Sequence, residues 1–79
     1  MALKTKTVPF GKIIVSEAQK DKFKRLVKNA KREKMKHENI TSFIYVAEKD
    51  RLYHLIDGLW RLAIYKVAKV RSVPCNVSE

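Results

Sequence analysis

Large apolar side chains are concentrated in residues 42–67, the stretch that also contains the only tryptophan, Trp60. An Asp-Gly pair at 57–58 separates two apolar runs, and this pair is a strong hairpin signal because glycine accepts the positive φ of a type I′ turn. A second turn at 49–50 would complete an antiparallel meander whose side chains alternate between two faces. The pattern therefore predicts three strands, with Trp60 in the core.

The two faces of this meander differ in polarity. One face carries no charge and is suited to packing under a helix; it consists of Ile44, Val46, Tyr53, Leu55, Trp60, Leu62 and Ile64. The other face is aromatic and aliphatic, and its polar interruptions are His54 and Arg61. A face of this composition, left open on one side of a sheet, is suited to binding.

A helix is the alternative for part of this stretch. Residues at spacings of three and four form one helical stripe: Arg51, His54, Gly58, Arg61, Tyr65 and Lys69. Against a helix, Gly58 would cost about 1 kcal/mol in a helix interior. The sequence Phe-Ile-Tyr-Val at 43–46 is also typical of a strand. These two points favour the meander.

Residues 12–32 predict a strand followed by an amphipathic helix. Lys12 to Val15 is a short β-branched run after Gly11. Ser16 and Gln19 have the spacing of a capping box, which predicts a helix start at residue 17. The apolar stripe of this helix is Phe23, Leu26, Val27 and Ala30, and the next residue in phase is Lys34, so the helix should end near Arg32.

We therefore predict an α+β domain at residues 10–73, with the element order strand-helix-strand-strand-strand and the amphipathic helix packed on a small antiparallel sheet. Residues 1–9 alternate lysine and threonine, and we expect them to form a mobile basic arm. Pro74 should stop the last strand, which leaves 74–79 as a tail.

The charge of the chain points to polyanions. Eighteen Lys+Arg against eight Asp+Glu give a net charge of +10 over 79 residues, and such an excess is typical of nucleic-acid binding. Much of it lies along one helix face and just beyond it: Lys22, Lys24, Arg25, Lys28, Lys31, Arg32 and Lys36. Cations at one-turn spacing match the phosphates of a nucleic-acid backbone. We predict a small, non-catalytic nucleic-acid-binding protein; whether the partner is DNA or RNA is left open.

The open sheet face offers a second candidate site. Tyr45, His54, Arg61 and Tyr65 would lie there together, where aromatic rings could stack on bases and the cations could contact phosphates. The same apolar face could instead bury itself against a second copy of the chain or another protein. Base-stacking platform, homodimer interface and protein-interaction surface are therefore three alternatives for this face.

Catalytic and metal chemistry receive little support. The single cysteine, Cys75, cannot form an internal disulfide, and with His37 and His54 as the only histidines there is no zinc-ligand set. We expect no catalytic residues, no metal and no cofactor. The N-terminus lacks a signal-peptide apolar core, and no uncharged run is long enough to span a bilayer, so we expect a cytoplasmic protein.

Residues 14–26 resemble the first strand and helix of the RelE/ParE toxin superfamily, and Gly-Leu-Trp-Arg-Leu at 58–62 is similar to a later strand of that family. The resemblance implies a small basic α+β fold. For its RNase members it implies cleavage of ribosome-bound mRNA by basic and aromatic side chains. Arg61, Tyr65 and Lys66 are the positions that this resemblance would place at the cleavage site.

A second resemblance supports the helical alternative. Residues 39–47, Asn-Ile-Thr-Ser-Phe-Ile-Tyr-Val-Ala, resemble the opening of the second helix in ribbon-helix-helix repressors. Lys12 to Val15 would then be the ribbon that enters the DNA major groove. This resemblance implies a mostly helical dimer that acts as a DNA-binding regulator.

Overall fold

The computed structural model describes residues 3–78. The strands are β1 (Leu3–Pro9), β2 (Ile13–Ile14), β3 (Ile44–Lys49), β4 (Leu52–Asp57) and β5 (Ser72–Ser78), and the α-helices are α1 (Lys20–Arg32) and α2 (Leu59–Ala68). Short 3₁₀ turns occupy Phe10–Lys12, Glu17–Gln19 and His37–Asn39. The predicted α+β class is confirmed.

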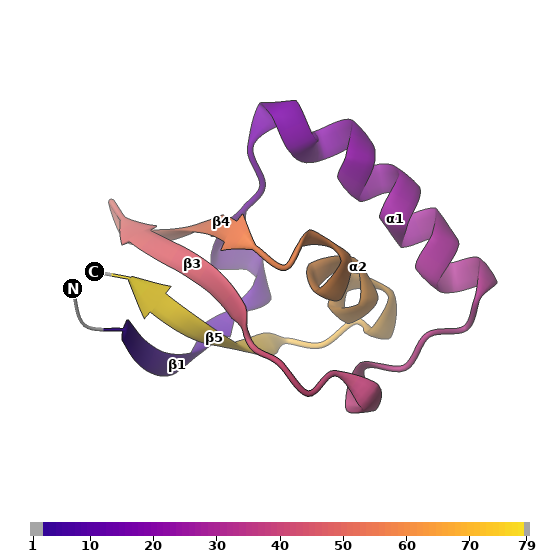
Figure 1. Cartoon of the computed structure of the whole chain (residues 1–79). Coiled ribbons are helices and arrows are strands. Elements are labelled where there is room, and N and C mark those ends of the chain that lie inside the picture. Colours follow the sequence, from indigo (N-terminus) through magenta and orange to yellow (C-terminus); the bar gives the residue numbers. More distant parts are fainter. Residues whose placement is uncertain (1–2, 79) are drawn as a thin grey trace.

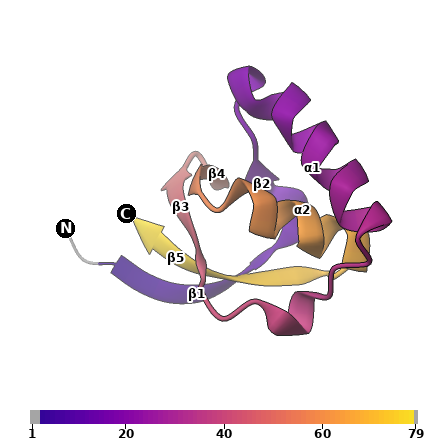
Figure 2. The same ribbon diagram turned by 45° about the vertical axis from the view of Figure 1, so that its right-hand side comes forward.

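The five strands form one sheet in the order β1-β5-β3-β4-β2 (Figure 1). The β1–β5 and β3–β4 pairs are antiparallel, whereas β3–β5 and β2–β4 are parallel. The sheet is therefore mixed rather than antiparallel. Helix α2 lies against one face of the sheet, and α1 packs on α2 (Figure 2). The amphipathic helix thus contacts the sheet layer mainly through a second helix.

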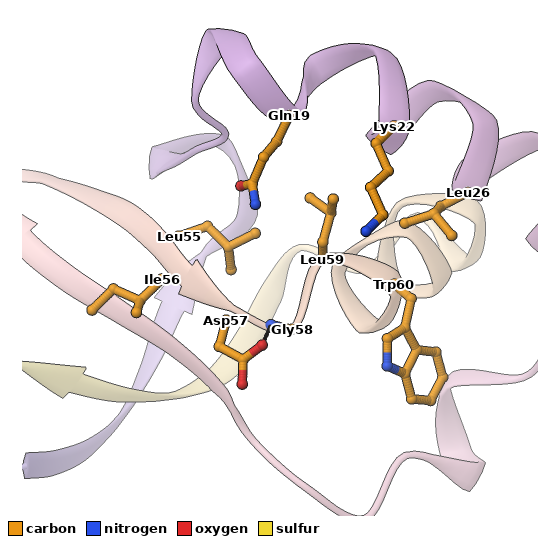
Figure 3. A pocket seen from close by; sticks show the side chains of 9 residues that line it. All are labelled: Gln19, Lys22, Leu26, Leu55, Ile56, Asp57, Gly58, Leu59 and Trp60. Carbon is orange, nitrogen blue, oxygen red and sulfur yellow. Dashed lines mark hydrogen bonds between the residues drawn. The ribbon is translucent and has the colours of Figure 1, made fainter.

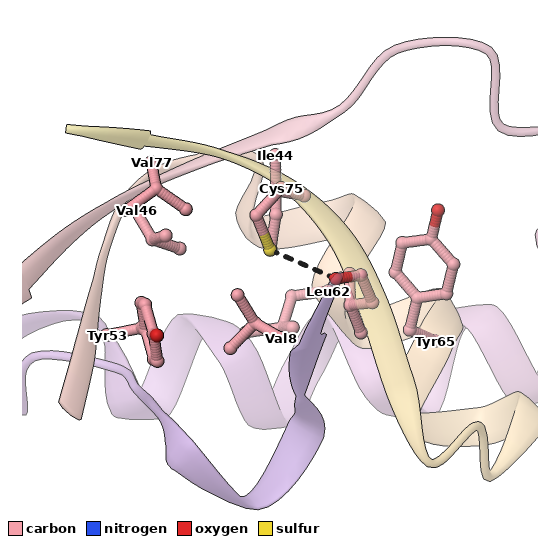
Figure 4. Close-up of a cluster of buried hydrophobic side chains, with 9 residues drawn as sticks. Val8, Ile44, Val46, Tyr53, Leu62, Tyr65, Cys75 and Val77 are labelled. Carbon is pink, nitrogen blue, oxygen red and sulfur yellow. Dashed lines mark hydrogen bonds between the residues drawn. The ribbon is translucent and has the colours of Figure 1, made fainter. Parts of the chain in front are cut away.

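The core lies between the sheet and α2. Its buried members are Val8, Ile44, Val46, Tyr53, Leu62, Tyr65, Val73, Cys75 and Val77 (Figure 4). They come from β1, β3, β4, β5 and α2, so every long strand contributes to it. Phe23 of α1 packs against the edge of this cluster and is half-buried.

The β3–β4 hairpin forms as predicted, with a small shift of its turn. The turn residues are Asp50 and Arg51, both with positive φ (56° and 66°), as a type I′ turn requires. Val46 consequently pairs with Leu55 and not with Tyr53. Since this register differs from the predicted one by two residues, each side chain stays on its predicted face.

The predicted strand after residue 58 is wrong, because residues 59–68 form α2. Gly58 is the N-cap of this helix, with φ 106°, and not a hairpin turn residue. A Cβ at Gly58 would lie 2.7 Å from Ile44 Cγ2. The turn into α2 therefore requires glycine both for its positive φ and for its close approach to Ile44. Trp60, expected in the core, is 48% exposed.

Both predicted terminal segments are also corrected. Residues 3–9 of the expected mobile arm are β1, which pairs with β5 along its whole length, from Leu3 opposite Ser78 to Pro9 opposite Ser72. Residues 74–78 of the expected tail belong to β5, and Pro74 lies within that strand. Residues 1, 2 and 79 of these two predictions lie outside the described residues.

Helix α1 ends at Arg32, as predicted, but its start differs. Ser16 makes no side-chain cap; its carbonyl oxygen accepts from the Gln19 N–H at 3.0 Å, which closes a 3₁₀ turn before α1 begins at Lys20. Both helices end in the same way. Lys34 after α1 and Lys69 after α2 adopt left-handed φ, and bonds such as Met35 N–H to the Ala30 carbonyl (3.1 Å) complete a Schellman motif.

Candidate functional site

The basic face of α1 consists of Lys22, Lys24, Arg25, Lys28, Lys31 and Arg32, all of them exposed. These are the six helical residues predicted to contact phosphates. They remain available because α1 buries its opposite stripe on α2 and leaves its outer side to solvent (Figure 2). Lys36, the seventh predicted basic residue, follows α1 and is exposed just before the His37–Asn39 turn.

Few acids neutralise this face. Asp21 is the only acidic residue within α1. Arg32 lies beside Glu33 (Nε to Oε1, 3.6 Å) and donates to Asn29 Oδ1 at 2.7 Å. The other five residues of the basic face form no ion pair with an acid among residues 3–78. Their charges are therefore open to an external anion.

The predicted platform on the open sheet face is not assembled. Tyr45 on β3 and His54 on β4 are exposed on the face opposite the helices. Arg61 and Tyr65 are instead on α2, on the other side of the sheet. Tyr65 is buried, and this burial raises the pKa of its hydroxyl. Two of the four residues therefore share a surface, and the helical structure of residues 59–68 separates them from the other two.

Arg61 also has a different neighbour from the one expected. Its Cζ lies 5.2 Å from the centre of the Trp60 ring, a cation–π contact at the surface of α2. His54 is paired across the ladder with Ala47 and lies on the other face. The two residues do not converge on one point, so the predicted grouping of His54 with Arg61 is not formed.

A cleft that the sequence did not predict lies where α2 begins. This α2 cleft has a volume of about 280 Å³ and is lined by Gln19, Lys22, Leu26 and residues 55–60 (Figure 3). The Lys22 side chain extends from α1 toward the start of α2 (Figure 3). One residue thus belongs to both the basic face of α1 and this cleft.

The start of α2 is a polar element in this cleft. The first intrahelical bond runs from the Leu62 N–H to the Gly58 carbonyl at 2.9 Å, so the N–H groups of residues 59–61 precede the helical ladder. No side chain caps them, and the first turn of α2 contains no acid. Asp57 Oδ1 accepts from the Gly58 N–H at 2.9 Å and is the one carboxylate in the lining. Such a helix start, with a lysine beside it, favours anions.

The signal for this cleft was present in the sequence but was assigned to another structure. An Asp-Gly pair followed by an apolar run was interpreted as a hairpin turn, whereas here the glycine takes a left-handed φ to start a helix. Both interpretations use the same property of glycine. The helical alternative includes Arg61 and Tyr65, but it places Gly58 in a helix interior and not at a helix start.

A second hollow, the β2 groove, lies between β2 and α1 and has a volume of about 500 Å³. Its lining combines four apolar residues with polar and charged ones: Ile13, Ile14, Val15, Ser16, Glu17, Lys20, Phe23, Lys24 and Lys66. The Lys66 Nζ lies 5.8 Å from the centre of the Phe23 ring. The groove is therefore apolar inside and cationic at its margin.

Cys75 lines neither hollow and is fully buried in the core. Its Sγ donates to the Val73 carbonyl oxygen at 3.4 Å, and burial raises the pKa of the thiol to about 11. A thiol held in this way is protonated near neutral pH and is a poor nucleophile.

Among residues 3–78, no cluster of three His, Cys, Asp or Glu side chains could hold a metal ion. Within the same range, no helix has the length and apolar character needed to cross a membrane.

Solved structures share the fold of this chain. One is sulfiredoxin from Arabidopsis thaliana, at a TM-score of 0.65 and 17% identity, covering 96% of this chain and 85% of that chain. Another is the C-terminally truncated chromosome-partitioning protein ParB from Caulobacter crescentus in complex with CTP-gamma-S, at a TM-score of 0.65 and 15% identity. That alignment covers 96% of this chain and 44% of the ParB chain.

At these identities the likeness shows the fold alone. No protein-family model matches the sequence, and no curated protein matches it either. Neither of these two structures is a RelE/ParE toxin or a ribbon-helix-helix repressor. The helix that the ribbon-helix-helix resemblance implied at residues 39–47 is not formed, since these residues end in strand β3.

Proposed function

We propose that the chain binds nucleic acid through its phosphate backbone, with the basic face of α1 as the contact surface. The observation that carries this proposal is the row of exposed cations on α1, of which five form no ion pair within residues 3–78. Neutralising phosphates with such a row releases condensed counterions and makes binding depend on salt. The net charge of +10 adds long-range attraction to any polyanion.

The test is a salt titration of binding with a matched pair of triple variants. Replacing Arg25, Lys28 and Arg32 with glutamine should weaken binding and reduce the salt slope by up to about three phosphate contacts. The control replaces Lys49, Arg51 and Arg71 with glutamine. It also removes two arginines and one lysine, at exposed positions outside α1. Fluorescence anisotropy with labelled single-stranded and duplex DNA and RNA measures both effects.

Only the α1 variant should lose affinity well beyond what its lower net charge explains. Equal losses in the two variants would show that binding is a property of net charge and that α1 is not the interface. The four labelled probes also rank DNA against RNA and single strands against duplexes, which the basic face of α1 alone does not determine.

A second candidate function is nucleotide binding in the α2 cleft. Lys22 and the uncapped start of α2 favour a phosphate group there. The ParB chain that shares this fold was solved with CTP-gamma-S. Trp60 lines the same cleft and is the only tryptophan, so its fluorescence reports directly on an occupant.

Titration with CTP, ATP, GTP and inorganic triphosphate should therefore change the Trp60 emission in a saturable way. Lys22→Gln should raise the dissociation constant by about ten-fold. Lys28→Gln, on the outer side of α1 and outside the lining, is the control and should leave the constant near its original value. An emission that stays constant with all four compounds would rule out this function.

The toxin-like RNase and the homodimer interface stay predictions. The RNase is tested by incubating the protein with free and ribosome-bound RNA, where we expect both RNAs to remain intact. The homodimer is tested by comparing the sedimentation of the wild-type protein with that of Tyr45→Lys. Tyr45 is exposed on the open sheet face, so a lysine there should disrupt a dimer formed through that face.

A further inference from the structure

The β2 groove combines an apolar interior with three lysines. We propose that it binds an acidic segment of a partner protein, in extended conformation, with aliphatic or aromatic side chains between its carboxylates. This site is separate from the proposed nucleic-acid contact, although Lys24 belongs to both surfaces.

The apolar part of the groove comes from both of its walls. Ile13 and Val15 are half-buried, Ile14 is 36% exposed, and Phe23 closes the opposite side from α1. Ile13, Val15 and Phe23 already pack against the edge of the core, so a partner would extend a formed surface. Covering them gains about 25 cal/mol for each Å² of apolar surface removed from water.

The charged part of the groove selects the sign of the partner. Three lysines line it, Lys20 and Lys24 from α1 and Lys66 from α2, against one acid, Glu17. Lys20 donates to Glu17 at 2.6 Å, so the charges of these two residues largely neutralise each other. Lys24 and Lys66 remain as cations in the lining, with the Lys66 Nζ 5.8 Å from the centre of the Phe23 ring. An occupant with carboxylates spaced around an apolar group complements this arrangement, whereas a basic one is repelled.

The position of β2 at the edge of the sheet indicates that the partner segment binds in an extended conformation. β2 is the terminal strand of the sheet, paired with β4 on one side. Among residues 3–78, no strand pairs with its other side. A peptide added to such an edge gains main-chain hydrogen bonds, and its alternate side chains enter the adjacent groove. Since β2 has two residues, these bonds are few and the side-chain contacts must supply most of the specificity.

The same features disfavour a nucleic-acid strand in this groove. Its floor is aliphatic, with Phe23 as the single aromatic ring, and that ring already carries the Lys66 ammonium at 5.8 Å. Single-strand binding sites instead present several open rings on which successive bases stack. The groove therefore fits alternating carboxylate and apolar side chains better than phosphates and bases.

The experiment uses three fluorescein-labelled peptides of about eight residues, a length that covers an edge strand. The first alternates glutamate with isoleucine and phenylalanine. The second replaces each glutamate with lysine, and the third keeps the glutamates but replaces the apolar residues with serine. Fluorescence anisotropy should show the first peptide binding at least about ten-fold more tightly than each of the others. Equal binding of the first and third peptides would mean attraction to net charge alone and would overturn the proposal.

Two variants locate the binding. Ile14→Glu and Lys66→Glu should each weaken the first peptide by about ten-fold or more, because each places a carboxylate in the groove. Ile56→Glu and Lys69→Glu make the same changes at exposed positions outside the groove and should have an effect of about two-fold at most. Equal losses in the two pairs would refute the site.

Amide chemical shifts of the wild-type protein provide a readout that needs no variant. On addition of the first peptide, the largest shifts should fall at residues 13–15 and Phe23. Largest shifts on the open sheet face would place the peptide there and overturn the proposal.

Saturation by decanoate, with peptide binding absent, would identify a small anionic amphiphile as the ligand and would also reject a peptide. Loss of nucleic-acid binding in the Arg25, Lys28 and Arg32 triple variant, with peptide binding kept, would separate the two functions.

Discussion

The two helices of this protein lie side by side but have opposite environments. α1 has one narrow apolar stripe and is otherwise exposed and basic, whereas α2 is apolar on most of its circumference and lies between the sheet and α1. Ala30 is the buried residue of α1, while Leu62, Ala63, Ile64 and Tyr65 are all buried in α2. The inner helix therefore belongs to the core, and the outer one leaves a basic surface exposed to solvent.

The strongest test of this contrast is at the start of α2. Gly58→Ala should destabilise the fold by about 2 to 5 kcal/mol, because the new Cβ meets Ile44 and the residue must keep a left-handed φ. Gly11→Ala is the control, since a Cβ there has no neighbour within 4 Å. Urea unfolding followed by circular dichroism measures both. Equal stability of the two variants would show that α2 can start without the close contact between Gly58 and Ile44.

Trp60 tests the one exposed side of α2. Because the residue is 48% exposed, Trp60→Ala should cost about 1 to 2 kcal/mol, well below the 3 to 5 kcal/mol of a buried tryptophan. Leu62→Ala, at a position 1% exposed, is the buried comparison and should cost about 2 to 5 kcal/mol. Thermal unfolding of both variants gives the comparison. A larger loss at Trp60 than at Leu62 would mean that the tryptophan is part of the core.

The helix ends give a smaller effect that applies to both helices. Lys34 and Lys69 occupy left-handed positions where glycine is the usual residue, so Lys34→Gly and Lys69→Gly should each stabilise the protein by about 1 kcal/mol or less. Scanning calorimetry detects such a change as a higher Tm. If only Lys69→Gly raises the Tm, α1 frays independently, and the outer helix does not unfold together with the rest.

Cys75 should resist chemical modification as long as the core is intact. Its thiol is fully buried, with its pKa raised to about 11, so thiolate is scarce at pH 8 in the folded protein. In the unfolded chain the pKa returns to about 8.5 and the thiol becomes accessible. Reaction with a chromogenic disulfide should therefore be slow in buffer and fast in urea. Rapid modification in buffer would show that β5 opens locally.

The contrast between the helices also explains which elements could be predicted. α1 has a one-sided apolar stripe, and its end at Arg32 follows from the charge at Lys34. β3 and β4 alternate between buried and exposed residues, so their faces were predictable even though the turn lies one residue further on. α2 is covered on two sides, and a buried helix of 10 residues has the same apolar composition as a buried strand.

Pairings between distant segments could not be predicted from local patterns. β1 and β5 are about 70 residues apart in the chain, and each is polar enough to resemble a terminal extension. Similarly, the basic face of α1 was visible as a helical stripe of cations. The α2 cleft and the β2 groove, however, arise where segments from α1, β2, β4 and α2 meet. Their residues have no common sequence spacing that would identify them in advance.

The position of β5 determines the order in which this protein can be completed. β5 lies between β1 and β3, so the first strand has no neighbour in the sheet until residues 72–78 are available. During synthesis, β2, β3, β4 and the two helices precede β5 along the chain, so β1 stays unpaired in the sheet until β5 has been made. Closing the contact between Leu3 and Ser78 is a long-range step, and such steps slow folding. The late arrival of β5 should therefore set the folding rate of the whole chain.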